Sequence, residues 1–368
     1  MKGLRSPSAR VVAVRATPLS VPLVEPFVIA TGRLDATRAA LVEVTLAGEG
    51  GRRVTGLGEA AALPPVTHED QPDLLRAFGA VEARLVGADV TDLAAAERLA
   101  SGALPESAVA RAGVAAALAD AWARLAGTPL HAALGGPASP PALETDITLP
   151  IGEASYVAGL AASYAAAGFR CFKVKVGRDH RADHAALRAV AAAVPGARFR
   201  LDANAGFSAA DALSLLDLVL GDGLTLECFE QPCAREDLAG MAEVTARSPV
   251  PVVADESFRG AEDLDRLVAA KAAHAVNLKL VKLGGPLTAV ALAREARRRG
   301  LRLMAGAMVE TRVGIATMAH VVAALGGVDW VDLDTAFLLA EDPFTGGYSS
   351  AGALLTVEAD AGHGVRLR

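Results

Sequence analysis

The sequence predicts an α/β barrel preceded by an α+β domain. Two patterns support this fold class. The first third of the chain has alternating strand patterns followed by helical patterns, and from about residue 131 eight short apolar segments alternate with alanine-rich helical segments. The length of 368 residues allows more than one unit, because an average domain has roughly 150 residues.

The N-terminal segment is typical of an antiparallel sheet followed by helices. Apolar and polar residues alternate at 11–23, 38–48 and 52–60, with glycine-rich turns between the last two stretches. From Asp73 to Gly127 apolar residues recur at helical spacing, with Ser107 as an expected N-cap and Gly127 as an expected helix end. We therefore predict an α+β domain over residues 1–130.

Eight strand candidates define the second part of the chain. The alternative to a barrel is an open, doubly wound sheet, but no G-x-G-x-x-G sequence follows the first strand, and eight strands favour closure. We place the barrel in residues 131–345 and expect residues 346–368 to return to the N-terminal domain. The predicted strands are residues 143–151, 171–177, 198–204, 226–232, 250–257, 275–282, 301–310 and 330–335.

Composition and charge exclude several function classes. Hydrophobic residues make up 52% and charged residues 21% of the chain, which excludes intrinsic disorder. The net charge is −6 and no basic block interleaves with aromatics, so we expect no nucleic-acid partner. The chain has no apolar run of about 20 residues and no signal-peptide pattern, so we expect a cytoplasmic protein without a membrane partner. The oligomeric state stays open, with a homo-oligomer as one alternative.

Charged residues stand at the ends of the predicted barrel strands, at intervals of about 25 residues, or one βα unit. In a parallel barrel these strand ends meet at a single mouth, where the active site lies. An Asp after a strand is often only a helix N-cap, and a Lys there is often solvated, but a regular series of both favours a shared site. The series is Lys175, Asp202, Glu230, Asp255, Lys279 and, about two units later, Asp332.

The three consecutive carboxylates of this series indicate a metal site. Asp202, Glu230 and Asp255 offer only oxygen ligands, and no His or Cys accompanies them. Such a set suits a hard octahedral cation, so we predict bound Mg²⁺.

The lysines of the series indicate proton transfer. Lys173 and Lys175 are two residues apart on one strand, so both side chains face the barrel interior. Lys279 comes from the sixth strand, across the barrel from the second. Two lysines that face each other across a substrate carbon can remove a proton on one side and return it on the other. For this role we expect a lowered lysine pKa.

In their order, these motifs resemble those of the enolase superfamily, and most of all the dipeptide epimerases of its muconate-lactonising subgroup. The resemblance covers the whole predicted barrel, and residues 130–136 are similar to the family's entry into the barrel. The motifs are K-x-K (173–175), D-A-N (202–204), F-E-Q-P (229–232), A-D-E-S (254–257) and N-x-K-x-x-K-x-G-G (277–285).

This resemblance implies a modified TIM barrel, (β/α)₇β, with an N-terminal capping domain, bound Mg²⁺, and abstraction of the proton α to a carboxylate. It implies that Lys175 and Lys279 are the acid/base pair and that Lys173 lies close to the substrate carboxylate. Asn204 and Glu256 are expected beside the metal.

The eighth strand indicates which member of the subgroup the chain resembles. Asp332 and Asp334 share one face of this strand. Two carboxylates aimed into a site that already holds metal and substrate carboxylate need a cationic partner, and a substrate α-ammonium supplies it. A D-x-D sequence here is similar to the dipeptide epimerases, where it binds the dipeptide N-terminus; ordinary loop caps are the alternative. Glu310, after the seventh strand, is expected either to face the site or to have a structural role.

The capping-domain loop leaves the second side chain of the substrate open. In the Ala-Glu epimerases an Arg that follows a Pro-Phe pair in this loop meets the glutamate side chain, whereas Arg33 comes one position later here. Ile29 in this loop favours an apolar pocket, so glutamate and a hydrophobic residue are both alternatives. Ile29 and Thr148 complete the expected substrate contacts.

We therefore expect a Mg²⁺-dependent dipeptide epimerase that inverts the α-carbon of the C-terminal residue of an L-Ala-L-Xaa-type dipeptide. The reaction is a 1,1-proton transfer between two lysines through an enediolate. The enzymatic alternatives are a cycloisomerase and an N-acylamino-acid racemase, neither of which requires a free amino terminus. A non-enzymatic protein on the same barrel is disfavoured, because the set of lysines and carboxylates is intact.

Overall fold

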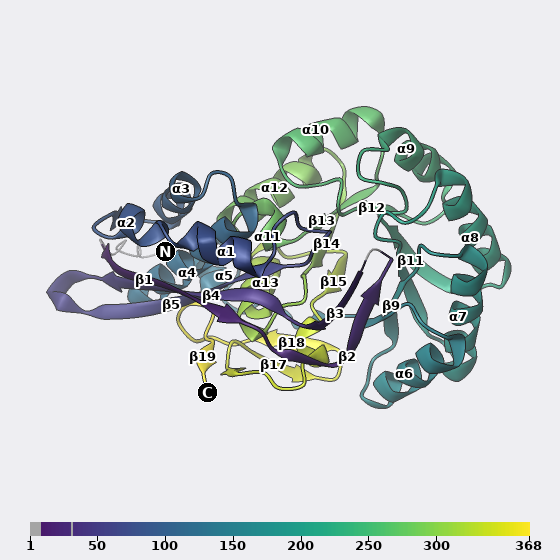
Figure 1. Cartoon of the computed structure of the whole chain (residues 1–368), viewed down its shortest axis with the longest axis horizontal. Helices are drawn as coiled ribbons and strands as arrows, with labels where there is room; N and C mark the ends of the chain where they lie inside the picture. The colour runs from purple at the N-terminus through teal and green to yellow at the C-terminus, as the bar shows by residue number, and fades with distance from the viewer. Residues whose placement is uncertain (1–8, 31) are drawn as a thin grey trace.

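The computed structural model describes residues 9–30 and 32–368. Strands and helices from the N-terminal part of the chain lie beside a ring of strands that helices surround (Figure 1). Residues 1–8, in the segment where we expect no signal peptide, and Thr31 lie outside the described residues. Within the described ranges, no helix has the length and hydropathy that a membrane span requires.

The predicted N-terminal sheet is confirmed as antiparallel. Its strand order is β5-β4-β1-β6, and all three predicted segments pair in it. The strands are β1 (Ala9–Leu19), β4 (Arg38–Ala47), β5 (Arg53–Ala62) and the short β6 (Asp89–Val90), and η1 (Glu49–Gly51) lies between β4 and β5.

A second hairpin interrupts the first predicted strand, so the prediction of one strand over 11–23 is wrong at its C-terminal end. The chain leaves the sheet after β1 and forms β2 (Pro22–Ile29), which pairs with β3 (Gly32–Ala36). The chain turns here because the Val21 N–H donates to Thr37 Oγ1 at 2.9 Å rather than to a neighbouring strand.

The predicted helices over residues 73–127 are present, and α4 has the predicted ends. Ser107 Oγ accepts a hydrogen bond from the Ala110 N–H, and the helix stops at Gly127, whose φ of +67° favours glycine. α4 packs tightly on β5, where a Cβ on Gly58 would overlap the carbonyl oxygen of Gly113. The helices are α1 (Gln71–Phe78), α2 (Val81–Leu85), α3 (Leu93–Ala103), α4 (Ala108–Ala126) and α5 (Leu130–Ala133).

The eight predicted barrel strands form one parallel sheet in sequential order, from β8 to β15. The open-sheet alternative is wrong, because Thr145 pairs with Val331 and the Asp146 N–H donates to Val331 O, which joins the first strand to the last. The strands are β8 (Ile147–Leu149), β9 (Cys171–Lys175), β10 (Arg198–Asp202), β11 (Thr225–Glu230), β12 (Val252–Ala254), β13 (Ala275–Leu278), β14 (Arg302–Gly306) and β15 (Trp330–Asp332).

Helices cover the outside of this ring (Figure 1). On β9, Phe172 and Val174 lie on the face under the helices, so Lys173 and Lys175 face the interior. The helices are α6 (Ala154–Ala166), α7 (His180–Ala193), α8 (Ala209–Gly221), α9 (Leu238–Arg247), α10 (Ala261–Ala270), α11 (Leu280–Leu283), α12 (Pro286–Arg298) and α13 (Arg312–Leu325).

The C-terminal segment contacts both parts of the chain. Its strands β17 and β18 extend from β7 beside the barrel, and His363 N–H donates to Asp120 Oδ1 on α4 at 2.8 Å. The remaining elements are β7 (Leu143–Glu144), η2 (Thr335–Leu338), β16 (Phe344–Thr345), β17 (Tyr348–Ala351), β18 (Leu354–Val357) and β19 (Arg366–Leu367).

Candidate functional site

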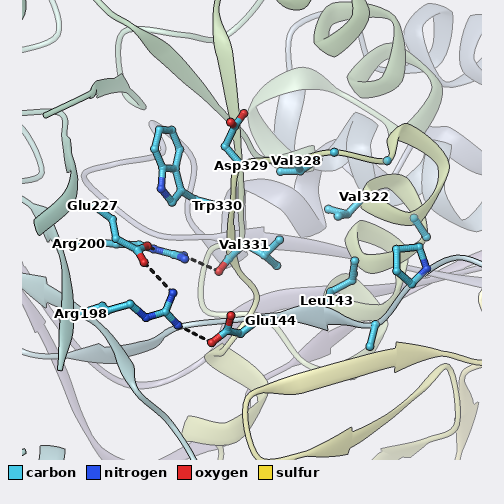
Figure 2. Close-up of a pocket in the computed structure, with 15 residues that line it drawn as sticks. Leu143, Glu144, Arg198, Arg200, Glu227, Val322, Val328, Asp329, Trp330 and Val331 are labelled. Atoms are coloured by element: carbon cyan, nitrogen blue, oxygen red, sulfur yellow. Dashed lines mark hydrogen bonds and ion pairs between the residues drawn. The ribbon is translucent and has the colours of Figure 1, made fainter. Parts of the chain in front are cut away.

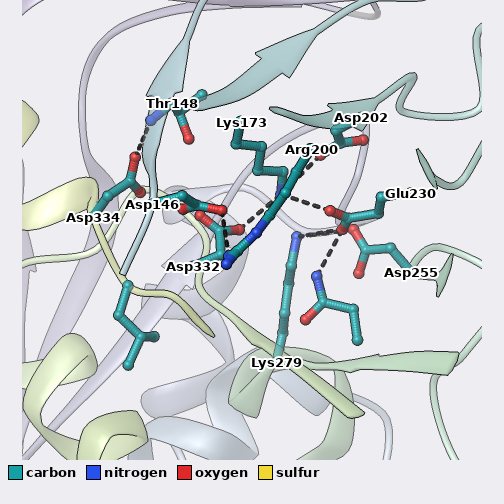
Figure 3. A network of polar contacts seen from close by, with 12 residues as sticks. Asp146, Thr148, Lys173, Arg200, Asp202, Glu230, Asp255, Lys279, Asp332 and Asp334 are labelled. Atoms are coloured by element: carbon teal, nitrogen blue, oxygen red, sulfur yellow. Dashed lines mark hydrogen bonds and ion pairs between the residues drawn. The ribbon is translucent and has the colours of Figure 1, made fainter. Parts of the chain in front are cut away.

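The charged residues picked out by the sequence converge at the C-terminal ends of the barrel strands (Figure 3). Lys173 lies at the centre of the group, and its side chain is only 2% exposed. Its Nζ is 2.8 Å from Glu230 Oε2 and 3.0 Å from Asp202 Oδ2 on one side. On the other side it donates to Asp332 Oδ2 at 2.7 Å. One ammonium group therefore bridges two groups of carboxylates.

Lys175 and Lys279 approach the same space from different strands. Lys175 Nζ donates to Asp202 Oδ2 at 2.6 Å, because these residues are register partners on β9 and β10. Lys279, directly after β13, donates to Asp255 Oδ2 at 2.8 Å. Three strands separate β9 from β13 in the sheet order, so the two lysines come from opposite sides of the barrel.

The expected lowering of the lysine pKa is wrong for Lys173 and Lys279. Burial disfavours the charged form of each, but the neighbouring carboxylates outweigh burial and raise both pKa values. For Lys279 these carboxylates are chiefly Asp255 and Glu230. Against the effect of burial, the same ion pairs lower the pKa of Asp202 and Asp255. The lysines and carboxylates are therefore paired as charged groups.

Asp202, Glu230 and Asp255 form an oxygen-rich cluster at neighbouring strand ends, and all three are fully buried. Beside them Asn204 Nδ2 donates to Glu256 Oε1 at 3.2 Å, while Asn204 Oδ1 and Glu256 Oε2 have no hydrogen-bond partner among the described residues. Burial, reinforced by Asp255, raises the pKa of Glu256 to about 8. Buried carboxylates with additional unpartnered oxygens fit a hard divalent cation such as Mg²⁺.

Two further residues hold this cluster in place, although the sequence analysis gave them no role. Lys282 Nζ contacts the Asp255 carboxylate and also donates to Asp255 O at 2.7 Å and to Asn277 O at 3.1 Å. Asn277 Nδ2 donates to Glu230 Oε1 at 2.7 Å. Both residues belong to the N-x-K-x-x-K motif, and this motif could have identified them as site residues.

A second acidic cluster lies on the other side of Lys173 (Figure 3). Carboxylate oxygens of Asp146, Asp332 and Asp334 lie within 4.8 Å of one another. Asp146 was not predicted as a site residue, because it lies inside an apolar strand segment. An ionisable residue in such a segment is the one sequence feature that could have identified it. Its Oδ2 accepts from Arg200 Nη1 at 2.8 Å.

Asp334 is the least neutralised member of this second cluster. Its Oδ2 accepts from the Thr148 N–H at 2.5 Å, whereas its Oδ1 has no hydrogen-bond partner within residues 9–30 and 32–368. Burial, reinforced by the charge of Asp332, raises the pKa of Asp334 to about 7. A cationic group placed beside Asp334 would therefore be strongly favoured.

Lys175, Lys279 and, from the second cluster, Asp332 line one cavity, here called the reaction pocket. Of the expected substrate contacts, Asp334 does not line the pocket, but it hydrogen-bonds Thr148, which does. Arg33 does not line it either; its Nη2 pairs with Asp35 Oδ1 at 2.8 Å and the side chain is 60% exposed. The lining residues are Phe27, Ile29, Leu63, Val66, Thr148, Lys173, Lys175, Asn204, Lys279, Ala307, Met308, Asp332 and Thr335.

Glu310 lies behind the wall of the reaction pocket and meets a carboxylate from the N-terminal sheet. Its Oε1 accepts from the N–H of Met308, a lining residue, at 2.9 Å. Glu59, on β5, accepts from the Thr311 N–H at 3.0 Å and from the Gly314 N–H at 3.1 Å, at the first turn of α13. A Cβ on Gly314 would overlap Glu310 Oε2, so both carboxyls converge there. Burial, reinforced by the charge of Glu310, raises the pKa of Glu59 to about 8, and burial raises that of Glu310 to about 7.

We expect the free energy of unfolding to fall as pH rises from about 5 to about 8, because the folded chain binds the protons of Glu59 and Glu310 more tightly than the unfolded chain. In Glu310→Gln, the free energy of unfolding should fall by about 2–3 kcal/mol less over the same pH range. Urea denaturation across this pH range measures the difference, with the exposed Glu49→Gln as the control. Equal slopes in the wild type and Glu310→Gln would show that the pair does not titrate.

A larger cavity, of about 300 Å³, lies at the opposite ends of the barrel strands (Figure 2). Its guanidinium groups are already neutralised: Arg198 pairs with Glu144 and Glu227, and Arg200 Nε donates to Glu227 Oε2 at 2.8 Å. None of the residues expected to act on a substrate or a metal lines it. The reaction pocket is therefore the candidate site.

Comparisons with known proteins agree with this assignment. The family model described as "Enolase C-terminal domain-like" matches residues 156–368, and the mandelate racemase / muconate lactonizing enzyme N-terminal domain model matches residues 11–135. An aromatic dipeptide epimerase from Herpetosiphon aurantiacus is 39% identical over 358 residues, covering 96% of this chain and 98% of its own length.

Two solved structures have closely similar folds. The substrate-liganded L-Ala-D/L-Glu epimerase from Bacillus subtilis has a TM-score of 0.91 and 29% identity, over 97% of this chain and 98% of that chain. A dipeptide epimerase from Cytophaga hutchinsonii, complexed with Mg and D-Ala-L-Val, has a TM-score of 0.91 and 26% identity, over 98% and 96%. The chain thus belongs to the mandelate racemase / muconate lactonizing enzyme family of the enolase superfamily and is an isomerase.

Proposed function

We propose that the protein is a Mg²⁺-dependent dipeptide epimerase that inverts the α-carbon of the C-terminal residue of an L-Ala-L-Xaa-type dipeptide. The observation that carries this proposal is one pocket lined by two lysines from opposite sides of the barrel and by Asp332, with Asp334 behind the lining residue Thr148. The relatives that are named dipeptide epimerases support it.

Inversion requires a base on each face of the substrate α-carbon. Lys175 and Lys279 both line the reaction pocket and start from β9 and from the end of β13. In the forward reaction, one lysine leaves its carboxylate partner and, as a neutral amine, takes the α-proton, while the ammonium of the other donates a proton to the opposite face. In the reverse direction the lysines exchange roles. The proton count is unchanged, as a 1,1-proton transfer requires.

The α-proton of a carboxylate is very weakly acidic, so the charge that develops on the carboxylate oxygens must be stabilised. Asp202, Glu230 and Asp255 would hold Mg²⁺, which supplies that stabilisation when bound. Lys173, with its charge fixed by three carboxylates, adds a second positive group at the same end of the pocket. Asn204 and Glu256 lie close enough to orient the carboxylate cluster.

The acidic pair, Asp332 and Asp334, would bind the amino-terminal end of the dipeptide. Asp332 and Asp334 lie beside Thr148 at the side of the pocket away from the Asp202 cluster. A dipeptide whose carboxylate lies near Lys173 and the metal ligands would place its α-ammonium there. Charge pairing at a buried site is favourable only when both partners are present, which makes the free amino group a requirement.

The test of this proposal is the effect of N-acetylation on a dipeptide substrate. We expect acetylation to lower kcat/KM by on the order of 100-fold or more, because it removes the charge that pairs with Asp334. The measurement is incorporation of solvent deuterium at the α-carbon, followed by mass spectrometry in D₂O. As a control, changing the C-terminal side chain should matter far less.

The result that contradicts the proposal is a better turnover of an N-acetyl or N-succinyl amino acid than of any free dipeptide. That outcome would assign the protein as an N-acylamino-acid racemase. From the protein side, Asp334→Asn should raise KM for the dipeptide with less effect on kcat, since the lost contact positions the substrate.

A further inference from the structure

We propose that the protein has a separate apolar subsite for the side chain of the first residue of its dipeptide, and that this subsite selects an aliphatic residue larger than alanine. This inference rests on the proposed two-lysine epimerisation of a dipeptide, and it changes the first residue of that dipeptide from alanine to a larger aliphatic residue. The subsite is a second cavity, beside the acidic pair, between β2 and α6. Its lining includes Val24, Phe27, Thr148, Leu160, Tyr164 and Leu338.

The second cavity adjoins the reaction pocket. Phe27 and Thr148 line both cavities. Thr148 also donates its N–H to Asp334 at 2.5 Å, so the wall between the cavities carries the acidic pair. Phe27 lies 5.6 Å from Lys175 Nζ, measured to the centre of its ring, which places the other end of this wall beside the proton-transfer groups.

Covalent geometry then directs the first side chain into the second cavity. In a dipeptide, the side chain of the first residue starts from the same carbon that carries the α-ammonium. With that ammonium at Asp332 and Asp334, the side chain starts next to Thr148, which also lines the second cavity. The second side chain starts at the carbon between Lys175 and Lys279, where the apolar lining is instead Ile29, Leu63, Val66 and Met308. The two side chains therefore lie in different cavities.

The chemistry of the second cavity favours an aliphatic side chain. Val24, which also lines the cavity, is 64% exposed, so it leaves apolar surface for a ligand to cover. Among the described residues, the one charged residue of the lining is Glu25, which accepts a hydrogen bond from Tyr156 Oη at 3.1 Å. An acidic first residue would meet Glu25 and Asp334, and no described residue of the lining offers it a cation.

The experiment compares dipeptides that differ only in the first residue: Gly, Ala, Val, Leu or Asp, followed by a constant L-Leu. Deuterium exchange at the second α-carbon in D₂O gives kcat/KM for each. We expect Leu to exceed Ala by about tenfold or more, since each buried methylene contributes about fourfold, and Asp to fall below Ala. Equal or better turnover with Ala or Asp than with Leu would overturn the subsite. If no dipeptide exchanges, the proposed function itself fails; if Ala-first dipeptides exchange and Leu-first ones do not, only the subsite fails.

Variants on α6 and η2 test the assignment from the protein side. Leu160→Trp fills the cavity and should lower the ratio of kcat/KM for Leu-first over Gly-first dipeptides by about tenfold. The matched control is Ala162→Trp, on the exposed side of the same helix, which should leave this ratio unchanged. Leu338→Ala enlarges the cavity and should shift the preferred first residue from Leu towards Phe. An unchanged ratio in both Leu160→Trp and Leu338→Ala would overturn the assignment.

Discussion

Replacing Lys279 by alanine is expected to abolish dipeptide epimerisation, with kcat lowered on the order of 10⁴-fold. Lys175→Ala should have an equally large effect, because inversion needs a base on one face of the α-carbon and an acid on the other. The two side chains come from opposite sides of the barrel and line the same pocket, so neither can take over the face that the other serves. Polarimetry, or chiral separation of the products, measures the loss.

A difference between the stereoisomers distinguishes this mechanism from general disruption of the site. In each single variant the remaining lysine still reaches its own face, so α-proton exchange in D₂O should survive for one stereoisomer and be lost for the other. The two variants should retain exchange of opposite stereoisomers. Lys271→Ala, at the exposed end of α10, is the matched control and should be fully active. Epimerisation at the wild-type rate in either Lys175→Ala or Lys279→Ala would refute the two-lysine mechanism.

Most of the barrel could be predicted from the sequence because its signals are local. Each barrel strand is a short apolar segment followed by an alanine-rich helix, and parallel strands place their C-terminal ends together. The convergence of Lys175, Asp202 and Glu230 follows from this arrangement, since they are register partners on β9, β10 and β11. The shared face of Lys173 and Lys175 follows from the two-residue period of a strand.

The features that the sequence did not predict depend on contacts between distant segments. Asp146 becomes part of the acidic cluster only because β8 closes the barrel against β15. Glu59 meets Glu310 behind the wall of the reaction pocket only because β5 packs against the first turn of α13. The hairpin of β2 and β3 was missed because Val21 and Pro22 continue the apolar alternation of β1.

The sequence also could not show whether the pKa values of the lysines are raised or lowered. A cation-rich site lowers a lysine pKa, but the distances decide which neighbours dominate. Lys173 has three carboxylate oxygens within 3.0 Å of its Nζ. The carboxylates therefore decide the sign, which a list of residue types cannot show.

The choice between the two carboxylate clusters as the Mg²⁺ site leads to the second large expected effect. Asp146 is bound by Arg200, whose Nη1 also donates to Val331 O and whose Nε donates to Glu227. A guanidinium fixed by several hydrogen bonds is not easily displaced. Asp202 and Asp255 are paired with lysines, whose long flexible side chains can turn towards a substrate when a cation takes their place. We therefore expect the cation at Asp202, Glu230 and Asp255.

Asp255→Asn should weaken Mg²⁺ binding by on the order of 100-fold, because a neutral amide replaces a charged ligand, and should abolish α-proton exchange. Asp334→Asn should leave the Mg²⁺ affinity within a few-fold of the wild type and impair only dipeptide binding. Isothermal titration calorimetry with MgCl₂ on chelator-treated protein measures the affinities without relying on activity. Loss of Mg²⁺ binding in Asp334→Asn, with normal binding in Asp255→Asn, would place the cation in the second cluster and leave the dipeptide amino group without the acidic partner that the proposed function requires.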